Sequence, residues 1–422
     1  MNNHSVLALF VLLFVFASSI GMRVYAKEGD KATEIALSRR HMVTGLNSKF
    51  NFSGMTFKKY IAHMRKVIAK TRVDINESNK KRILDANSPY EWTPESQACP
   101  KNRNGKHRNG ILMIHGLTDS PFALHDIAGI FLERCYLVRG ILLPGHGTVP
   151  GDLLEVSHKE WLKATKYGID SLRSEVENIF LGGFSTGGAL SLYYALKKEP
   201  IRALILFSPA IKIETDAAFL SGWANKLTWI SDETKWLNKK KDEDYTKYES
   251  FPLNAAAEIY KLTDTVNGIS RSRKVDMPMF VVVSEDDTTI SSEATVAFFQ
   301  GQSNGNSRLI LFSNSTARHE DKRITLFSPK HEHLNVISQS HLSLTYDMRN
   351  VHYGIGGDYR NCLHYGYEDE RYEKCKSGSD ILWGENSEEN IAEGIVARIS
   401  FNPDFAYMRD RLNQFLNRVE TP

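Results

Sequence analysis

Between Ile111 and Glu285 the chain repeats one pattern of short apolar runs separated by segments of helix length. The apolar runs, rich in valine, isoleucine and leucine, are ILMIHG, YLVRGILLPG, NIFLGGFS, IRALILFSP and MPMFVVVSE. Segments such as PFALHDIAGIFLERC and HKEWLKATKYGIDSLRSEV lie between them. Strands that are apolar on both faces and alternate with helices are typical of a parallel sheet covered on both sides. The pattern therefore predicts an α/β fold with a mostly parallel central sheet and helices on both faces.

A serine stands at the turn that follows the third apolar run. The stretch LGGFSTGGAL, 181–190, places Ser185 in a G-x-S-x-G motif between a strand-like and a helix-like segment. This frame is typical of a nucleophile elbow, in which a tight turn holds a serine hydroxyl above the sheet at a helix N-terminus. Glycines are needed because the turn leaves no room for neighbouring Cβ atoms. Ser185 is the predicted nucleophile.

Two further glycine-bearing turns follow apolar runs. In IHGLTDSP, 114–121, the His-Gly pair frees the next backbone amides to point into a cavity. The amide of Leu117, with that of Thr186 just after the serine, is predicted to donate to a developing oxyanion. In ILLPGHGT, 141–148, His146 is expected to shape its loop by hydrogen bonding to the backbone.

A serine hydroxyl needs a base, and the base needs an acid that orients it. The expected chain order is serine, acid, histidine. MPMFVVVSEDDTTI offers two aspartates, and Asp287 is preferred because Ile290, three residues on, can anchor its loop; Asp286 remains the alternative. His341, between LNVIS and HLSL, is the predicted base. Five other histidines lie downstream of the acid: His319, His331, His333, His352 and His364.

Four of these motifs, in this order, resemble a known family. IHGLTDSP, LLPGHGT, GGFSTGGAL and SEDDTTI look like the oxyanion loop, GHG loop, elbow and acid turn of α/β-hydrolases. They are most similar to the carboxylesterase and monoacylglycerol-lipase branch, over roughly residues 85–345. The resemblance implies a cap over an acyl pocket. It also implies Ser185 as nucleophile, Asp287 as acid, His341 as base, and Leu117 and Thr186 as oxyanion donors.

The domain organisation follows from these motifs. The stretch 212–265 is longer than a simple crossover and holds Trp223, Trp229 and Trp236, so a helical cap is expected there. The spacing from acid to base is long for the family, and the tail 350–375 has no counterpart in its core. The expected divisions are 1–26 signal peptide or anchor, 27–109 helical extension and connector, 110–211 first part of the core, 212–265 cap, 266–345 second part of the core, and 346–422 C-terminal extension and final helix.

The N-terminus carries the uncharged run SVLALFVLLFVFASSIGM, residues 5–22, and then VYA before Lys27. This arrangement predicts a secretory signal with a small residue at the cleavage site. Basic residues follow the run rather than precede it, and the run is long enough to span a bilayer, so an uncleaved anchor stays open. The expected location is exported or membrane-anchored, with a possible association with a membrane surface.

The chain has four cysteines, and no pair has the spacing of a zinc site. Cys135 lies between a helix-like and a strand-like run and is expected to be a core thiol. Cys362 and Cys375 flank a polar segment, where a disulfide is expected if the protein is exported. The HEH triplet at 331–333 is interpreted as polar loop, and no metal or cofactor is predicted.

A net charge of +3 in 422 residues indicates no nucleic-acid partner. The cap tryptophans and Phe122 favour a small-molecule ester with an apolar acyl chain: a monoglyceride, a lysophospholipid or a simple carboxylic ester. An amidase, peptidase or thioesterase would use the same triad. A non-catalytic binding protein on a hydrolase scaffold is the alternative of another class, but it would not need the serine, the acid and the oxyanion loop together.

Overall fold

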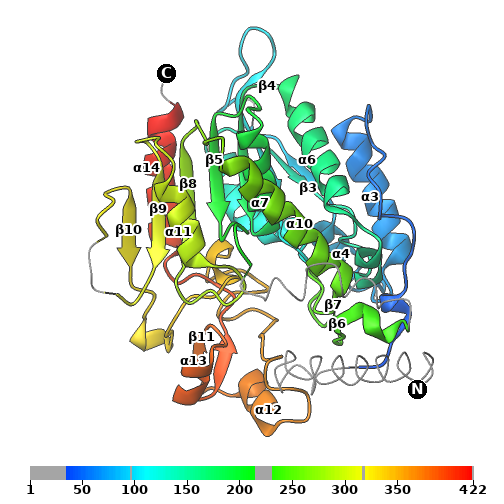
Figure 1. Ribbon diagram of the computed structural model, residues 1–422. Helices are drawn as coiled ribbons and strands as arrows, with labels where there is room; N and C mark the ends of the chain where they lie inside the picture. Colours follow the sequence, from blue (N-terminus) through cyan, green and yellow to red (C-terminus); the bar gives the residue numbers. More distant parts are fainter. Residues whose placement is uncertain (1–34, 96, 214–230, 316–318, 421–422) are drawn as a thin grey trace, which may run out of the picture.

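The computed structural model describes residues 35–95, 97–213, 231–315 and 319–420. Within them lies an eight-stranded sheet in the order β1-β3-β2-β4-β5-β8-β9-β10 (Figure 1). β1 pairs antiparallel with β3, and the other pairs are parallel. The predicted α/β fold with a mostly parallel sheet is confirmed. The strands are β1 (Tyr90–Trp92), β2 (His107–Ile114), β3 (Leu137–Ile141), β4 (Val176–Phe184), β5 (Ala203–Phe207), β8 (Met279–Ser284), β9 (Arg308–Phe312) and β10 (Ile324–Phe327).

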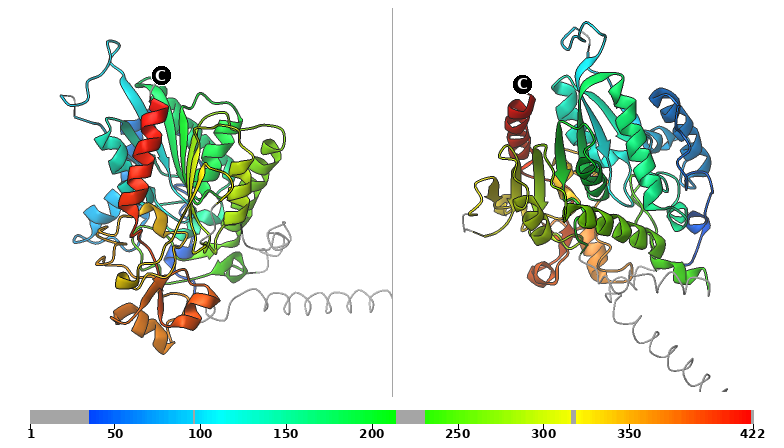
Figure 2. Two further views of the ribbon diagram at one scale, coloured as in Figure 1. Left: turned by 90° about the vertical axis from the view of Figure 1, so that its left-hand side faces the viewer. Right: turned by 45° about the horizontal axis from the view of Figure 1, so that its top comes forward.

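Helices cover both faces of the sheet (Figure 2), and each face carries a separate hydrophobic core. In β2, Leu112 and Ile114 belong to one core, and Ile111 and Met113 to the other. Successive side chains of a strand point to opposite faces, which is why these strands are apolar throughout. The first face is covered by α3 (Phe57–Thr71), α6 (His158–Arg173), α7 (Thr186–Leu196), α10 (Leu253–Ser270) and α11 (Ser292–Gln300), and the second by α5 (His125–Glu133) and α14 (Phe405–Glu420).

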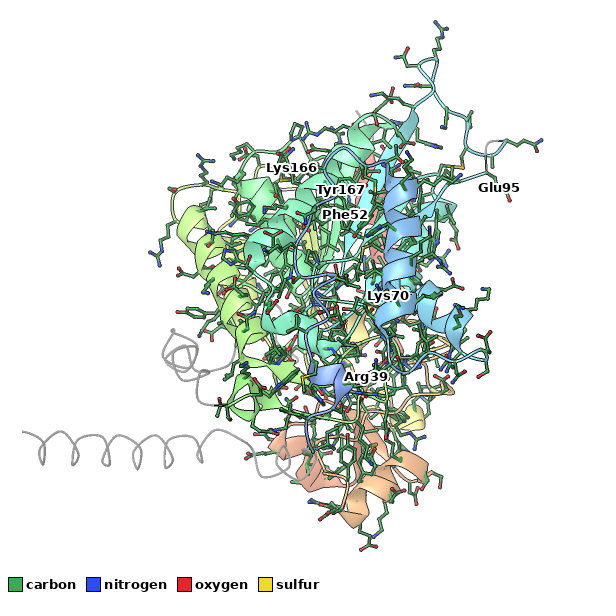
Figure 3. The ribbon with its side chains drawn as sticks, turned by 90° about the vertical axis from the view of Figure 1, so that its right-hand side faces the viewer. Arg39, Phe52, Lys70, Glu95, Lys166 and Tyr167 are labelled. Atoms are coloured by element: carbon green, nitrogen blue, oxygen red, sulfur yellow. A yellow bond between two sulfur atoms is a disulfide. The ribbon has the colours of Figure 1, made fainter. Side chains whose placement is uncertain are left out.

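The N-terminal extension packs on the helical layer through aromatic side chains (Figure 3). The helix expected over 56–72 is α3, and a short helix α4 (Lys80–Asn87) follows it. Phe52 lies 5.1 Å from the ring of Tyr60, and Phe50 lies 5.2 Å from that of Tyr167 on α6. The Tyr60 hydroxyl donates to the carbonyl of Leu142, directly after β3. The extension is therefore tied to the carboxyl end of β3 and, through Asn47, which donates to the carbonyl of His146 at 2.7 Å, to the loop that carries His146.

The segment predicted to be a helical cap is only partly helical where the structure describes it. From 231 to 252 it contains a 3-10 turn and two short antiparallel strands, β6 (Trp236–Asn238) and β7 (Phe251–Pro252). α10 begins at Leu253 and continues past the predicted boundary at 265. Trp236 is buried edge-on against His41, with ring centroids 4.9 Å apart. Trp223 and Trp229 lie outside the described residues.

The C-terminal extension divides into a small module and a helix that returns to the sheet. Residues 346–404 include a two-stranded parallel sheet and two short helices around a core of their own. In Figure 1 this module lies below the large sheet. The predicted final helix is α14, whose Phe415 lies 5.7 Å from Phe280 of β8. The module elements are α12 (Glu370–Ser377), β11 (Leu382–Gly384), α13 (Glu388–Glu393) and β12 (Val396–Arg398).

All four cysteines are in disulfides. Cys362 pairs with Cys375, as expected. Cys135 is not a core thiol but pairs with Cys99. It lies in the turn between α5 and β3 with a φ of 67°, and the bond joins this turn to the connector that precedes β2. The predicted signal peptide or anchor falls outside the described residues, and among the residues that are described no helix is long and apolar enough to cross a membrane.

Candidate active site

The serine turn has the geometry of a nucleophile elbow. β4 ends at Phe184 and α7 begins at Thr186, so Ser185 alone forms the corner, with φ 52° and ψ −111°. Such a conformation is costly for a residue with a side chain. A Cβ on Gly183 would lie 2.4 Å from the carbonyl oxygen of Gly187, and one on Gly187 would lie 1.8 Å from that of Ile114. The two glycines are therefore required sterically.

The predicted acid and base are in direct contact. His341 Nδ1 lies 2.6 Å from Asp287 Oδ2, and the Asp287 side chain is fully buried. An Nδ1–H that donates to the carboxylate leaves Nε2 as the acceptor nitrogen. The amides of Thr289 and Ile290 donate to Asp287 Oδ1 at 2.8 and 3.1 Å, and Ile290 is buried as its spacing predicts. The loop amides thus bind one oxygen of the Asp287 carboxylate while the other oxygen contacts His341.

Electrostatics keep Asp287 ionised. Burial alone would favour the neutral acid, but the charge and hydrogen bond of His341 and the two loop amides outweigh it, so the pKa of Asp287 lies below its ordinary value. Burial, and then the neighbouring Glu285 and Glu385, raises the pKa of Asp286 to about 6. The two adjacent carboxyl groups therefore have opposite environments, and it is Asp287 that meets the histidine.

The pair formed by His341 and Asp287 lies next to the serine corner. The His341 ring is 5.0 Å from the ring of Phe184, the residue before Ser185. Of the other downstream histidines, His331 contacts Asp404 at 2.9 Å and His352 contacts Asp244 at 2.9 Å. The sheet explains why Ser185, Asp287 and His341 lie close together. β4 and β8 run parallel in the same sheet, so the loops at their carboxyl ends lie on the same side of it.

The predicted oxyanion donors are the backbone amides of Thr186, directly after the corner, and of Leu117. Thr186 is the first residue of α7, where backbone amides have no partner within the helix. Within the described part of the chain, neither the Thr186 amide nor the Leu117 amide is hydrogen-bonded to an acceptor. The helix N-terminus adds a partial positive charge at the same place. This environment suits a developing negative oxygen.

Two buried histidines join the loops around the site. His146 Nε2 accepts from the Thr118 amide at 3.1 Å, and its Nδ1 donates to the carbonyl of Pro144 at 3.1 Å. Burial lowers the pKa of His146 to about 4, so the ring is neutral and can fill both roles. The structural role expected for this residue is confirmed.

His115 makes the matching pair of bonds, which the sequence did not suggest. Its Nε2 accepts from the Leu143 amide at 3.0 Å, and its Nδ1 donates to the carbonyl of Gly116 at 2.7 Å. Burial lowers its pKa well below the ordinary value. The only sequence signal was its place beside Gly116 in the His-Gly pair. Together the two imidazoles fix the oxyanion loop to the GHG loop.

The segment between β6 and β7 lies against the oxyanion loop. The Tyr248 amide donates to the carbonyl of Thr118 at 2.8 Å, and the Tyr248 ring is stacked on His146 with centroids 6.3 Å apart. Lys247 Nζ lies 3.7 Å from the buried carboxylate of Asp119. Phe122, also in this region, lies among aromatic rings that belong to Tyr245, Tyr346 and Tyr353.

No group of three or more histidine, cysteine, aspartate or glutamate side chains that could hold a metal ion occurs in the residues that the structure places. In the HEH triplet, His331 is bonded to Asp404 and lies 5.9 Å from the ring of His333. The groups that gather at the strand ends include a hydroxyl, an imidazole and a carboxylate, which are components of nucleophilic acyl transfer.

Comparison with protein families supports the same conclusion. The family described as serine aminopeptidase, S33, matches residues 105–320, just over half of the chain. The chain belongs to this family. It is thus an α/β-hydrolase of a serine hydrolase family, and the match includes the oxyanion loop, the elbow and the acid turn but ends before His341.

Individual relatives of this S33 hydrolase are distant. A thermostable monoacylglycerol lipase from Bacillus sp. (strain H-257) is 25% identical over 206 residues, which are 49% of this chain and 81% of the relative. The crystal structure of a monoacylglycerol lipase from Paleococcus ferrophilus is 17% identical, with a TM-score of 0.41, covering 54% of this chain and 88% of that one. A structure of a metagenome-derived lipolytic enzyme is 20% identical, with a TM-score of 0.44 over 54% and 88%.

Proposed function

We propose that this S33 hydrolase cleaves carboxylic esters through a Ser185–His341–Asp287 triad and an acyl-enzyme intermediate. The observation that supports this most is the 2.6 Å contact between His341 and Asp287 beside a serine held at an elbow. A serine elbow alone is a turn, and a histidine–aspartate pair alone is common in proteins. Their meeting at one edge of the sheet is what a nucleophile with its base and acid requires.

The proposed reaction begins with His341 Nε2 accepting the proton of the Ser185 hydroxyl as its oxygen attacks the ester carbonyl. Asp287 stabilises the imidazolium and keeps Nδ1 protonated, which its lowered pKa permits at neutral pH. The amides of Leu117 and Thr186 bind the tetrahedral oxyanion, and such a donor lowers the activation barrier by about 3 kcal/mol. His341 then protonates the leaving alcohol, and water releases the acyl group by the same steps.

The proposed substrate is an ester with an apolar acyl chain, such as a monoglyceride, a lysophospholipid or a simple carboxylic ester. Support comes from the Bacillus relative, which is named as a monoacylglycerol lipase. The aromatic residues give less support than expected, because Trp236 and Phe122 pack against other rings. A second candidate is an aminopeptidase-type amide hydrolase, which the description of the matching family favours.

A series of substrates separates the two candidates. Glycerol and p-nitrophenyl esters of increasing acyl length are compared with aminoacyl amides by kcat/KM. The ester proposal expects hydrolysis that increases with chain length and at least about a hundredfold preference over amides. A preference for the amides would replace it with the second candidate.

We also propose that the protein is exported or anchored by its N-terminal apolar run. Two disulfides support an oxidising compartment, because such bonds rarely persist in a reducing cytosol. The mass of the mature N-terminus tests cleavage after Ala26. A mature chain that begins at Met1 and partitions into membranes would favour the anchor, and a reduced cytosolic protein would contradict both.

A further inference from the structure

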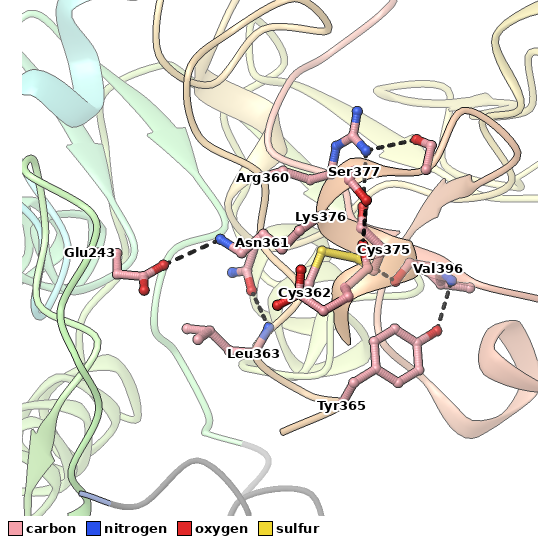
Figure 4. The surroundings of a disulfide bond; sticks show 12 residues. Glu243, Arg360, Asn361, Cys362, Leu363, Tyr365, Cys375, Lys376, Ser377 and Val396 are labelled. Carbon is pink, nitrogen blue, oxygen red and sulfur yellow. Dashed lines mark hydrogen bonds and ion pairs between the residues drawn. A yellow bond between two sulfur atoms is a disulfide. The ribbon is translucent and has the colours of Figure 1, made fainter. Parts of the chain in front are cut away.

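The small C-terminal module contacts the large sheet at the loop that carries His341. The Trp383 amide of β11 donates to the carbonyl of Asn335 at 2.8 Å, and the Ile337 amide donates to the carbonyl of Trp383 at 2.9 Å. The Ser340 hydroxyl donates to the carbonyl of Ile399, just after β12. The six residues before the predicted base therefore pack against the module. The disulfide between Cys362 and Cys375 lies in the core of the module (Figure 4).

Glu385, the residue after β11, has a carboxylate that faces this loop. Its side chain is fully buried. Oε1 accepts from Arg398 Nε at 2.6 Å and from the Asn386 amide at 2.9 Å. Oε2 accepts from Arg398 Nη2 at 3.1 Å and from the backbone amide of His341 at 3.4 Å. One carboxylate therefore binds the guanidinium and the main chain of the base.

Arg398, the last residue of β12, extends the contact to the acid. Its Nη2 also donates to Thr289 Oγ1 at 3.2 Å. The amide of Thr289 is the group that donates to Asp287 Oδ1 at 2.8 Å. The chain of contacts thus runs from the His341 amide through Glu385 and Arg398 to the loop that holds Asp287.

We propose that Glu385 and Arg398 are positioning residues for the reaction, fixing the distance between the loops of the base and the acid. The inference rests on the proposed triad. A buried ion pair gains little net stability, because each charge loses its hydration on burial. A pair kept only for stability would not need to bond to both loops. A displacement of 1 Å in a catalytic group can cost about a hundredfold in rate, so a brace of this kind affects kcat.

The pair also balances charge beside the site. Removal of the Arg398 charge leaves a buried carboxylate near the base, which favours protonated imidazole. Removal of the Glu385 charge leaves the Arg398 guanidinium as a cation near His341, and this charge disfavours protonated imidazole. The two substitutions should therefore move the acid limb of the pH–rate profile in opposite directions. The other ionisable groups that face this pair or His341 are not substituted in either variant; they are Asp119, Asp286, Asp287, Tyr359 and His364.

The test measures kcat, KM and the pH dependence of kcat/KM on a p-nitrophenyl ester for Glu385→Gln, Arg398→Gln and the double variant. Each single change should lower kcat about tenfold or more, with KM within about twofold. The acid limb of the pH–rate profile should move to higher pH in Arg398→Gln and to lower pH in Glu385→Gln, by about 0.5 pH unit or more. In the double variant the acid limb should lie at the same pH as in the wild-type protein. Arg398→Lys keeps the positive charge but loses the planar guanidinium with its several N–H donors. This variant should leave the acid limb at the wild-type pH and should lower kcat.

A control is Glu420→Gln, which removes the carboxylate paired with Arg134 near the end of α14, at the opposite end of the molecule from the module (Figure 1). The two arginines have similar exposure, 22% for Arg134 and 20% for Arg398. Glu420→Gln should lower the melting temperature without a change in kcat or in the acid limb. If Glu385→Gln and Arg398→Gln behave like the control, the pair is structural and the inference fails while the esterase proposal stands. If either variant does not fold, Arg398→Lys decides by the same readouts. Wild-type protein without hydrolysis of esters or amides would overturn both proposals.

Discussion

Asp286 and Asp287 are adjacent in sequence and opposite in environment. Asp287 is paired with His341 and bonded by two loop amides. Asp287→Asn should therefore lower kcat about a thousandfold or more on an ester, because an amide can impose the wrong tautomer on the histidine. Asp286→Asn is the matched control and should change kcat by less than about threefold. Equal losses in both variants would contradict the assignment of the acid.

Asp286 should affect stability in a pH-dependent way. Its pKa of about 6 in the folded protein lies above the ordinary value near 4, so its ionisation destabilises the fold as pH rises between these values. Asp286→Asn removes that cost and should raise the melting temperature at pH 7.5. The full shift corresponds to about 3 kcal/mol, and solvent screening of this half-buried group reduces the expected gain to about 2 kcal/mol. At pH 4 the two proteins should melt alike. A gain that is equal at both pH values would show that burial does not govern this carboxyl.

At the residue scale, the sequence predicted the site from short-range patterns. Ser185 was recognisable from its two glycines, and Asp287 from the buried isoleucine three residues on. His341 was harder, because 54 residues separate it from Asp287 and no local motif marks a base. The bracing role of Glu385 and Arg398 had no sequence signal at all, since it depends on contacts between distant segments.

Among the elements, the turn from β4 to α7 tolerates the least change. A Cβ on Gly187 would overlap the Ile114 carbonyl oxygen at 1.8 Å. Gly187→Ala should therefore cost about 3 kcal/mol or more and abolish hydrolysis, because β2 and α7 must separate. Gly129→Ala is the matched control in α5, where a Cβ meets nothing within 4 Å; it should stabilise the protein by about 0.5–1 kcal/mol. Denaturant unfolding and ester hydrolysis measure both effects.

Strands and helices of the hydrolase core were predictable because short apolar runs alternate with segments of helix length and several of the runs end at glycine turns. The segment 231–252 was not, because its tryptophan content suggested helices whereas its residues pair as short strands and loops. The fold of the C-terminal module was also not predictable. Its strands are three residues long, and its core depends on a disulfide and on contacts with the loop of His341.

At the scale of the whole molecule, the two disulfides should differ in their effect on activity. Loop-closure entropy gives about 4 kcal/mol for the Cys99–Cys135 bond, which spans 36 residues, and about 3 kcal/mol for Cys362–Cys375, which spans 13. Replacement of either pair by serine should lower the melting temperature. Only the loss of Cys362–Cys375 should also lower kcat below the melting transition, because that module braces His341. Equal kcat in both variants would contradict the coupling of module and site.

The central claim is that Ser185 is a nucleophile activated by His341 and Asp287. A fluorophosphonate probe tests it most directly, because it reacts covalently only with an activated serine. Mass spectrometry should find one probe per wild-type chain, attached to Ser185, and none on Ser185→Ala folded to the same melting temperature. Labelling should be slower in Asp287→Asn. An unlabelled wild-type protein, or labelling that persists in Ser185→Ala, would contradict the account.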